Sequence, residues 1–139
     1  LYTSHLPFKD EYLIDLMKFG NKYNNKRLIS WCEYLLTKYI EKKVTNQIAK
    51  SNFDFIGLLL LSQEIKADQL TKFLLHFIST NYTAVSKMKK YKILKGNNLK
   101  YIEKNRWPPK WYEDKCLKYK KDLNEWNKKY SKYNDNDSN

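Results

Sequence analysis

Glycine and proline are nearly missing from this chain, which has only three of each among its 139 residues. Sandwiches and barrels of β-strands need many turns, and those turns rely on glycine and proline. Helices joined by short polar connections need far fewer. The sequence therefore predicts an all-α fold of antiparallel helical hairpins stacked side by side, followed by a long C-terminal helix.

Apolar residues recur at helical spacing in four segments between Asp10 and Asn81, which predicts two hairpins. A shift of 42 residues aligns the two hairpins, placing Leu16 on Leu58, Gly20 on Ser62, Leu28 on Leu70, Trp31 on Phe73 and Cys32 on Leu74. These positions, including Trp31, are expected in the core. A doubled helix pair can bury both apolar faces, so the repeat predicts two units of a helical stack.

The C-terminal part has a different pattern. Pro108 and Pro109 cannot continue a helix but can begin one. The helix that they start is predicted to reach Tyr133. It carries a narrow stripe of mostly aromatic residues: Trp111, Tyr112, Cys116, Tyr119, Leu123, Trp126 and Tyr130. Residues 134–139 are predicted from their composition to be a disordered tail.

The net charge of +12 is concentrated in the C-terminal third. Residues 86–133 hold 16 Lys or Arg against 5 Asp or Glu, whereas residues 1–85 hold 11 against 8. A basic helical domain that binds nucleic acid or an acidic partner through residues 86–133 is thus an alternative function. Its basic patch would comprise Lys89, Lys90, Lys92, Lys95, Lys100, Lys104, Arg106 and Lys110. A solvated lysine face is the interpretation we favour, because base recognition and phosphate binding prefer arginine.

The sequence gives no pattern of residues for catalysis. His5 and His76 lie far apart without a carboxylate or cysteine partner, and no phosphate-binding loop or metal-ligand spacing occurs. We therefore expect no enzyme activity, no catalytic or metal site and no cofactor. Cys32 and Cys116 are predicted to be buried free thiols in a reducing compartment. Without a signal peptide or membrane span, the expected location is intracellular, cytoplasmic or nuclear, with no membrane partner.

Several motifs resemble the C-terminal part of BTB/POZ proteins. Residues 1–6 (LYTSHL) resemble the end of the last BTB strand region, and residues 13–20 and 32–35 (CEYL) are similar to the final BTB helix pair. Residues 55–78 resemble the BACK, or 3-box-like, hairpin, with Ala67-Asp68-Gln69-Leu70 and the Phe77–Asn81 stretch matching recurring patterns. The BTB core is absent, and the chain begins on Leu1, so we expect that residues precede it.

The resemblance implies a domain organisation. Residues 1–45 would be the last helix pair of a BTB-like domain, residues 46–106 a BACK-like helical region and residues 107–133 the proline-started helix. It also implies a protein–protein interaction module, part of a BTB–BACK adaptor for a cullin-type ubiquitin ligase. Such adaptors form homodimers through the BTB core, which is missing here.

In that picture a cullin N-terminal domain would dock into an apolar groove between the third and fourth helices. Seven residues would line it: Phe53, Phe55, Ile56, Leu59, Leu70, Phe73 and Phe77. Phe53 and Phe55 flank Asp54 and cannot both face one core, so one of the two is expected to line a surface groove. Of the seven residues, this pair is the one expected to be exposed. Trp107 is expected to pack against the preceding helices.

Overall fold

A computed structural model describes residues 9–44, 48 and 50–137. Residues 1–6, which carry part of the BTB resemblance, lie outside this range, as do residues 138–139 at the end of the predicted tail. The elements are α1 (Asp10–Lys22), α2 (Lys26–Tyr39), a π-helical turn η1 (Ile40–Val44), α3 (Phe55–Glu64), α4 (Asp68–Thr80), α5 (Tyr82–Val85), a 3₁₀ turn η3 (Lys89–Ile93), α6 (Gly96–Asn105) and α7 (Lys110–Asp137). The described residues contain no strand, so the predicted all-α fold is confirmed.

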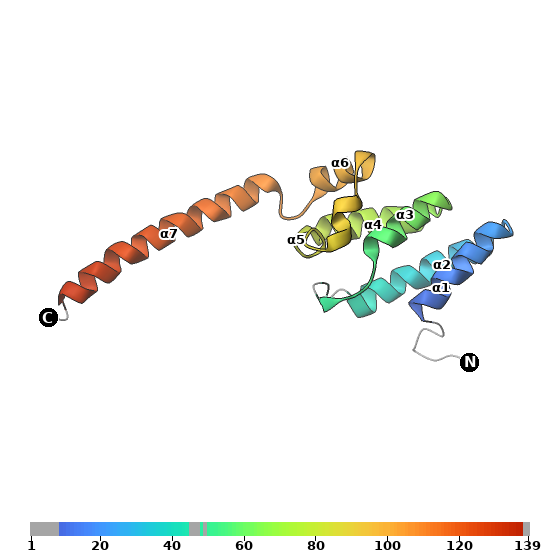
Figure 1. Cartoon of the computed structure of the whole chain (residues 1–139), viewed down its shortest axis with the longest axis horizontal. Coiled ribbons are helices and arrows are strands. Elements are labelled where there is room, and N and C mark those ends of the chain that lie inside the picture. The colour runs from blue at the N-terminus through green and yellow to red at the C-terminus, as the bar shows by residue number, and fades with distance from the viewer. Residues whose placement is uncertain (1–8, 45–47, 49, 138–139) are drawn as a thin grey trace. The chain divides into compact units, whose positions relative to one another are not determined.

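The chain divides into two compact units, residues 1–107 and residues 108–139. In the first unit, α1 pairs with α2 and α3 pairs with α4, as Figure 1 shows. Helix α4 occupies a central place, since it also contacts α2 and α6. Over its described residues, 108–137, the second unit contains one helix, α7.

The two hairpins turn in the same way at positions 42 residues apart. In the first turn, the Asn25 N–H donates to the Gly20 carbonyl over 2.7 Å, and Asn24 has a φ of 53°. In the second turn, the Ala67 N–H donates to the Ser62 carbonyl over 2.7 Å, and the φ of Lys66 is 59°. Both turns are Schellman motifs, which satisfy the last carbonyl groups of a helix. The predicted alignment of the hairpins is therefore confirmed in backbone detail.

The same alignment explains the two small residues near the turns. A β-carbon on Gly20 would lie 3.0 Å from Cγ1 of Ile29, so the absence of a side chain lets α2 approach closely. Ser62 occupies the equivalent position on α3, and its hydroxyl lies 2.9 Å from that of Thr71. Position 71 is in turn equivalent to position 29. Each hairpin thus closes at a contact between one small residue and one β-branched residue.

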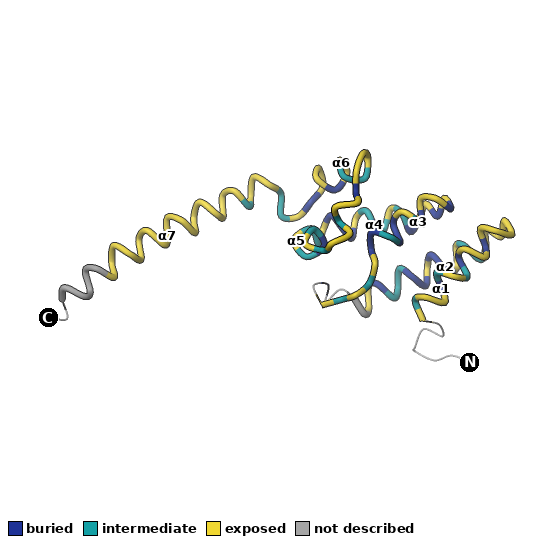
Figure 2. Tube along the Cα trace, in the orientation of Figure 1, coloured by how far each residue is buried: buried dark blue, intermediate teal, exposed yellow. Residues whose placement is uncertain are grey.

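The core fills the space within and between the hairpins (Figure 2). Its fully buried residues include Leu13, Met17, Leu36, Phe55, Leu59, Leu70, Leu74 and Ile78. The prediction that Trp31 is a core residue is wrong, because its side chain is 45% exposed. Trp31 lies one position before the buried Cys32 on α2, and a helix turns each successive residue by about 100°. Cys32 itself is buried as predicted, and burial raises the pKa of its thiol.

Glu33 joins the two hairpins. It is a charged residue that is only 7% exposed, and its carboxylate accepts the Leu70 N–H over 2.8 Å. Leu70 lies in the first turn of α4, where backbone N–H groups have no partner within the helix. The N-cap residue Ala67 has no side-chain hydrogen bond to offer. Helix α2 therefore supplies the cap that the sequence of α4 lacks.

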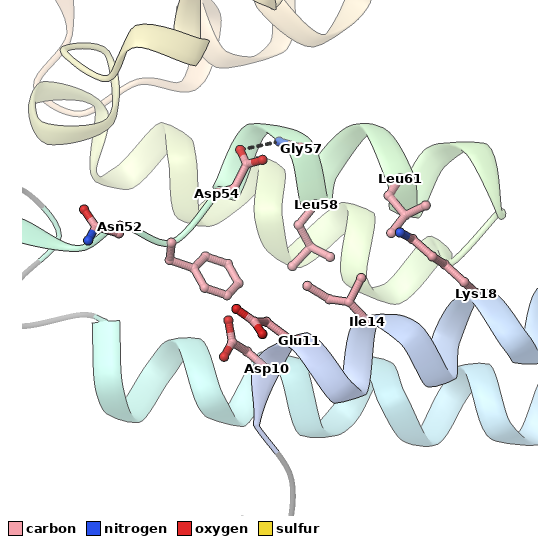
Figure 3. A pocket seen from close by; sticks show the side chains of 10 residues that line it. Asp10, Glu11, Ile14, Lys18, Asn52, Asp54, Gly57, Leu58 and Leu61 are labelled. Atoms are coloured by element: carbon pink, nitrogen blue, oxygen red, sulfur yellow. Dashed lines mark hydrogen bonds between the residues drawn. The ribbon is translucent and has the colours of Figure 1, made fainter.

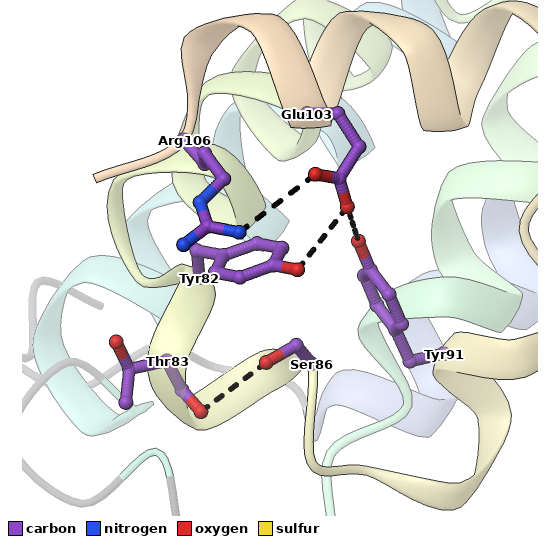
Figure 4. A network of polar contacts seen from close by, with 6 residues as sticks. All are labelled: Tyr82, Thr83, Ser86, Tyr91, Glu103 and Arg106. Carbon is purple, nitrogen blue, oxygen red and sulfur yellow. Dashed lines mark hydrogen bonds and ion pairs between the residues drawn. The ribbon is translucent and has the colours of Figure 1, made fainter. Parts of the chain in front are cut away.

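Arg106 closes the C-terminal end of the first unit (Figure 4). Its guanidinium lies 4.1 Å from the ring centroid of Tyr82 and 3.8 Å from Glu103, and only 8% of the residue is exposed. The hydroxyl groups of Tyr82 and Tyr91 both donate to Glu103, over 3.1 Å and 3.4 Å. Burial, then the nearby Tyr82 and Glu103, raise the pKa of the Tyr91 hydroxyl far above its ordinary value, so it remains a donor.

We expect the Arg106→Ala variant to lose about 2 kcal/mol of unfolding free energy, because a buried cation–π contact and the packing of the side-chain stem disappear together. Arg106→Lys should recover only part of this loss, since an ammonium group cannot lie flat on Tyr82. Urea denaturation followed by circular dichroism measures both values. Lys104→Ala, at an exposed position of the same segment, is the control. Equal effects of Arg106→Ala and Lys104→Ala would contradict the assignment.

The side chain of Trp107, which is expected to pack against the preceding helices, is 59% exposed. Its backbone contacts α4, because the Trp107 N–H donates to the Ser79 carbonyl over 2.8 Å. Together with the buried Arg106, this hydrogen bond fixes the end of the first unit onto α4.

Helix α7 begins just after Pro108 and Pro109, as predicted. It continues to Asp137, so it includes four residues whose composition predicts a disordered tail. Between Lys110 and Ser131, where side chains are described, no residue is buried. Cys116 is exposed, which corrects the prediction of a buried thiol. The mostly aromatic stripe of α7 is therefore exposed, because a helix cannot bury one of its faces without a neighbouring element.

Candidate functional site: a groove between α1 and α3

Five of the seven residues predicted to line a groove between α3 and α4 fill the space between helices instead. They are Phe55, Ile56, Leu59, Leu70 and Phe77, each no more than 6% exposed. Phe53 and Phe73 are partly exposed. The expectation that Phe55 is exposed is wrong. Asp54 is the N-cap of α3, so Phe55 falls in the first helical turn, where its ring lies 5.1 Å from that of Phe77.

The structure has a groove elsewhere, between α1 and the start of α3 (Figure 3). It has a volume of about 380 Å³. Its apolar lining comes from Ile14 on α1, from Phe53, and from Leu58 and Leu61 on α3. In Figure 3 the side chains of Ile14 and Leu58 point toward one another across the space between the helices. The two walls of the groove therefore belong to different hairpins.

One end of the groove is acidic, although the chain as a whole carries a net charge of +12. Asp10 and Glu11 at the start of α1 and Asp54 at the start of α3 contribute carboxylates, and Lys18 lies farther along α1. Burial raises the pKa of the neighbouring Tyr39, with a smaller contribution from the Asp10 charge. The Tyr39 ring lies 5.7 Å from that of Phe53. A partner with apolar side chains and a positive charge near Phe53 would fit this surface.

Asp54 is held in place by two contacts. Its Oδ1 accepts the Gly57 N–H over 2.9 Å, and its Oδ2 pairs with the ammonium group of Lys90. A β-carbon at Gly57 would overlap the Asp54 carboxylate, which explains why a glycine interrupts the apolar run of α3. A second cavity of about 350 Å³ shares Asn52, Phe53 and Asp54 with the groove and reaches residues 88–90. These three residues thus line both cavities.

Of the residues that line this groove, only Phe53 belongs to the partner groove predicted from the sequence. A signal was present, because Leu13, Ile14, Leu16 and Met17 make the apolar face of α1 wider than one neighbour requires. Leu13 and Met17 are buried, and Ile14 lies on a different side of the helix.

The predicted basic patch is divided by the structure. Lys89, Lys92, Lys95, Lys100 and Lys104 are exposed, Lys90 pairs with Asp54, Arg106 is buried, and Lys110 belongs to the second compact unit. Arg106 therefore cannot offer its guanidinium to a phosphate without leaving Tyr82 and Glu103. Binding of nucleic acid through the remaining lysines stays a prediction.

Within the described part of the chain, no three His, Cys, Asp or Glu side chains are grouped so that they could hold a metal ion. No helix in that part has the length and apolar character needed to cross a membrane. His76 is an exposed residue of α4, and His5 lies outside the described residues.

Comparison with known proteins gives several Rho-related BTB domain-containing proteins as relatives. The chain is 30% identical over 106 residues to human Rho-related BTB domain-containing protein 3, a match that covers 76% of this chain and 17% of that protein. It is 33% identical over 115 residues to human Rho-related BTB domain-containing protein 1, with 81% of this chain and 16% of that protein covered. The chain is related to a region of Rho-related BTB proteins.

Human Rho-related BTB domain-containing protein 2 is likewise 33% identical over 115 residues. This chain spans about a sixth of the length of these BTB relatives. No family model and no solved structure matches it. The predicted relation to BTB proteins is confirmed, whereas the assignment of residues 46–106 to a BACK region stays a prediction.

Proposed function

We propose that the chain is a protein–protein interaction module of a BTB-type adaptor, and that the groove between α1 and α3 receives the N-terminal segment of a cullin. The groove itself is the observation that carries the proposal. It is an open apolar surface bordered by charge, built where a BTB-like helix pair meets the following hairpin. Peptide segments commonly bind in such grooves, with side chains inserted between two helices.

Three features support a peptide segment as the occupant. The volume of about 380 Å³ suits a few side chains, and a second cavity continues beyond Phe53 and Asp54. The apolar lining provides affinity through burial of the partner's side chains. The carboxylates of Asp10 and Glu11 favour a partner with a basic residue at that end, and so fix its direction along the groove.

Calorimetry with a cullin N-terminal domain and the full 139-residue chain tests the proposal. We expect binding that persists at high salt, because apolar contacts respond weakly to ionic strength. Ile14→Glu should weaken it about tenfold or more, since a carboxylate would enter the apolar part of the groove. Leu60→Glu is the matched control, because Leu60 is a 39% exposed leucine of α3, the helix of the other groove wall, and does not line the groove.

A parallel titration with duplex DNA tests the alternative function, which is nucleic-acid binding through residues 86–133. Salt-sensitive DNA binding without cullin binding would move the function to the lysines of the C-terminal third. Equal losses in Ile14→Glu and Leu60→Glu would also contradict the proposed groove. Circular dichroism of both variants ensures that a lost signal reflects the groove and not unfolding.

A further inference from the structure

Helix α7 presents a regular seam on its surface. Tyr112, Cys116, Tyr119, Leu123, Trp126 and Tyr130 follow one another at alternating steps of four and three residues. From Tyr119 to Tyr130 these side chains are at least 50% exposed. Among the described residues of its compact unit (108–137), the helix is the only element, so no other described element of that unit covers the seam.

The spacing of the seam indicates what kind of surface covers it. A repeat of 3.5 residues drifts by about 20° per heptad around a helix of 3.6 residues per turn, and a left-handed supercoil with another helix compensates for that drift. A membrane surface would favour a broad apolar face with a straight axis. Here the seam is narrow, and the charged residues Asp122 and Lys129 lie directly beside it.

The charges beside the seam oppose pairing of two identical copies. With Cys116, Leu123 and Tyr130 at the a positions, Lys115 and Lys120 occupy flanking g and e positions. A parallel pair would place Lys115 of one copy opposite Lys120 of the other. An antiparallel pair that overlaps fully from Tyr112 to Tyr130 would bring Lys120 against Lys120 and Asp122 against Asp122.

We propose that α7 forms a two-stranded coiled coil with a helix of another protein that carries acidic residues beside its own apolar seam. At the e and g positions that flank the α7 seam, three lysines (Lys115, Lys120 and Lys129) outnumber two acidic residues (Glu113 and Asp122), and these lysines would pair with the partner's carboxylates. Between Lys110 and Ser131 the helix has 7 lysines against 4 acidic residues, and the whole chain carries +12, so its long-range field also attracts an acidic partner. This surface is separate from the groove in the first compact unit.

The probe is a synthetic 28-residue peptide with Ile at every a position, Leu at every d position and Glu at every e and g position. A matched peptide carries Lys at the e and g positions. We expect the full chain to bind the acidic peptide about tenfold or more tightly than the basic one in calorimetry at low salt. A lack of preference would overturn the proposal. So would a dimer of the chain alone in sedimentation, or binding to anionic vesicles but to neither peptide.

Two matched pairs of variants separate the seam from the rest of the helix. Leu123→Glu should abolish binding, whereas Leu117→Glu, which adds the same charge, should leave it unchanged, because Leu117 is 64% exposed and lies off the seam. Lys115→Glu with Lys120→Glu and Lys129→Glu should reverse the preference between the peptides. Lys118→Glu with Lys121→Glu and Lys128→Glu changes the net charge equally but away from the seam, and should keep the preference. Equal effects within either pair would overturn the proposal.

Discussion

Replacing Phe55 by alanine should lower the unfolding free energy by about 3–5 kcal/mol, as is typical when a fully buried aromatic residue is truncated. Phe55 has no exposed surface, and its ring contacts those of Phe53 and Phe77 at centroid distances of 5.0 Å and 5.1 Å. The truncation leaves a cavity between α3 and α4 that these neighbours can fill only in part. Urea denaturation gives the value from the shift of the midpoint at constant m.

Phe53→Ala is the natural control, because the same residue type lies two positions away and is only partly buried. We expect it to cost about 1 kcal/mol, in proportion to the smaller area removed from the core. Phe53→Ala should weaken cullin binding more than Phe55→Ala does, since Phe53 lines the groove. Equal stability losses in the two variants would show that Phe55 is not the buried member of the pair.

Replacing Glu33 by alanine should lower the unfolding free energy by about 2–3 kcal/mol. The buried Leu70 N–H would lose its acceptor, and hydrogen bonds to a charged group are worth more than neutral ones. The first turn of α4 would also lose the negative charge that a helix N-terminus favours. For a unit of this size the melting temperature should fall by roughly 10 °C or more.

Glu33→Gln separates these two contributions. Its amide oxygen can accept the same N–H, so it should recover part of the loss while the benefit of the charge remains absent. Glu64→Ala removes an exposed carboxylate from α3 and should change the unfolding free energy little. If Glu33→Ala behaved like Glu64→Ala, the buried hydrogen bond would contribute nothing to stability.

Local pattern was enough to predict the helices and the pairing within each hairpin. The 42-residue shift even anticipated equivalent backbone hydrogen bonds at Gly20 and Ser62, because a turn between two helices depends on a few neighbouring residues. Pro108 and Pro109 likewise predicted where the long C-terminal helix begins. The end of that helix was predicted wrongly. The polar composition of residues 134–137 predicts disorder, but composition takes no account of a helix that already runs up to these residues and continues through them.

The groove was not predictable from the same information. Its position depends on how one hairpin packs on the other. The spacing of apolar residues within a hairpin does not predict that packing. The pair Phe53 and Phe55 shows the limit, since the capping role of Asp54 decides which ring enters the core. Glu33 shows it again. From the sequence alone, its carboxylate on α2 would be predicted to be a surface charge. Only the packing of α2 on α4 brings it to the Leu70 N–H.

Because the two walls of the groove come from different hairpins, its width follows the contact between α2 and α4, which includes the Glu33 hydrogen bond. Binding and stability are therefore thermodynamically linked: a segment that binds only the assembled hairpins raises the free energy of separating them. The linkage is reciprocal, so anything that loosens the Glu33 contact reduces the population able to bind. A substitution far from the groove can thus weaken recognition without touching the partner.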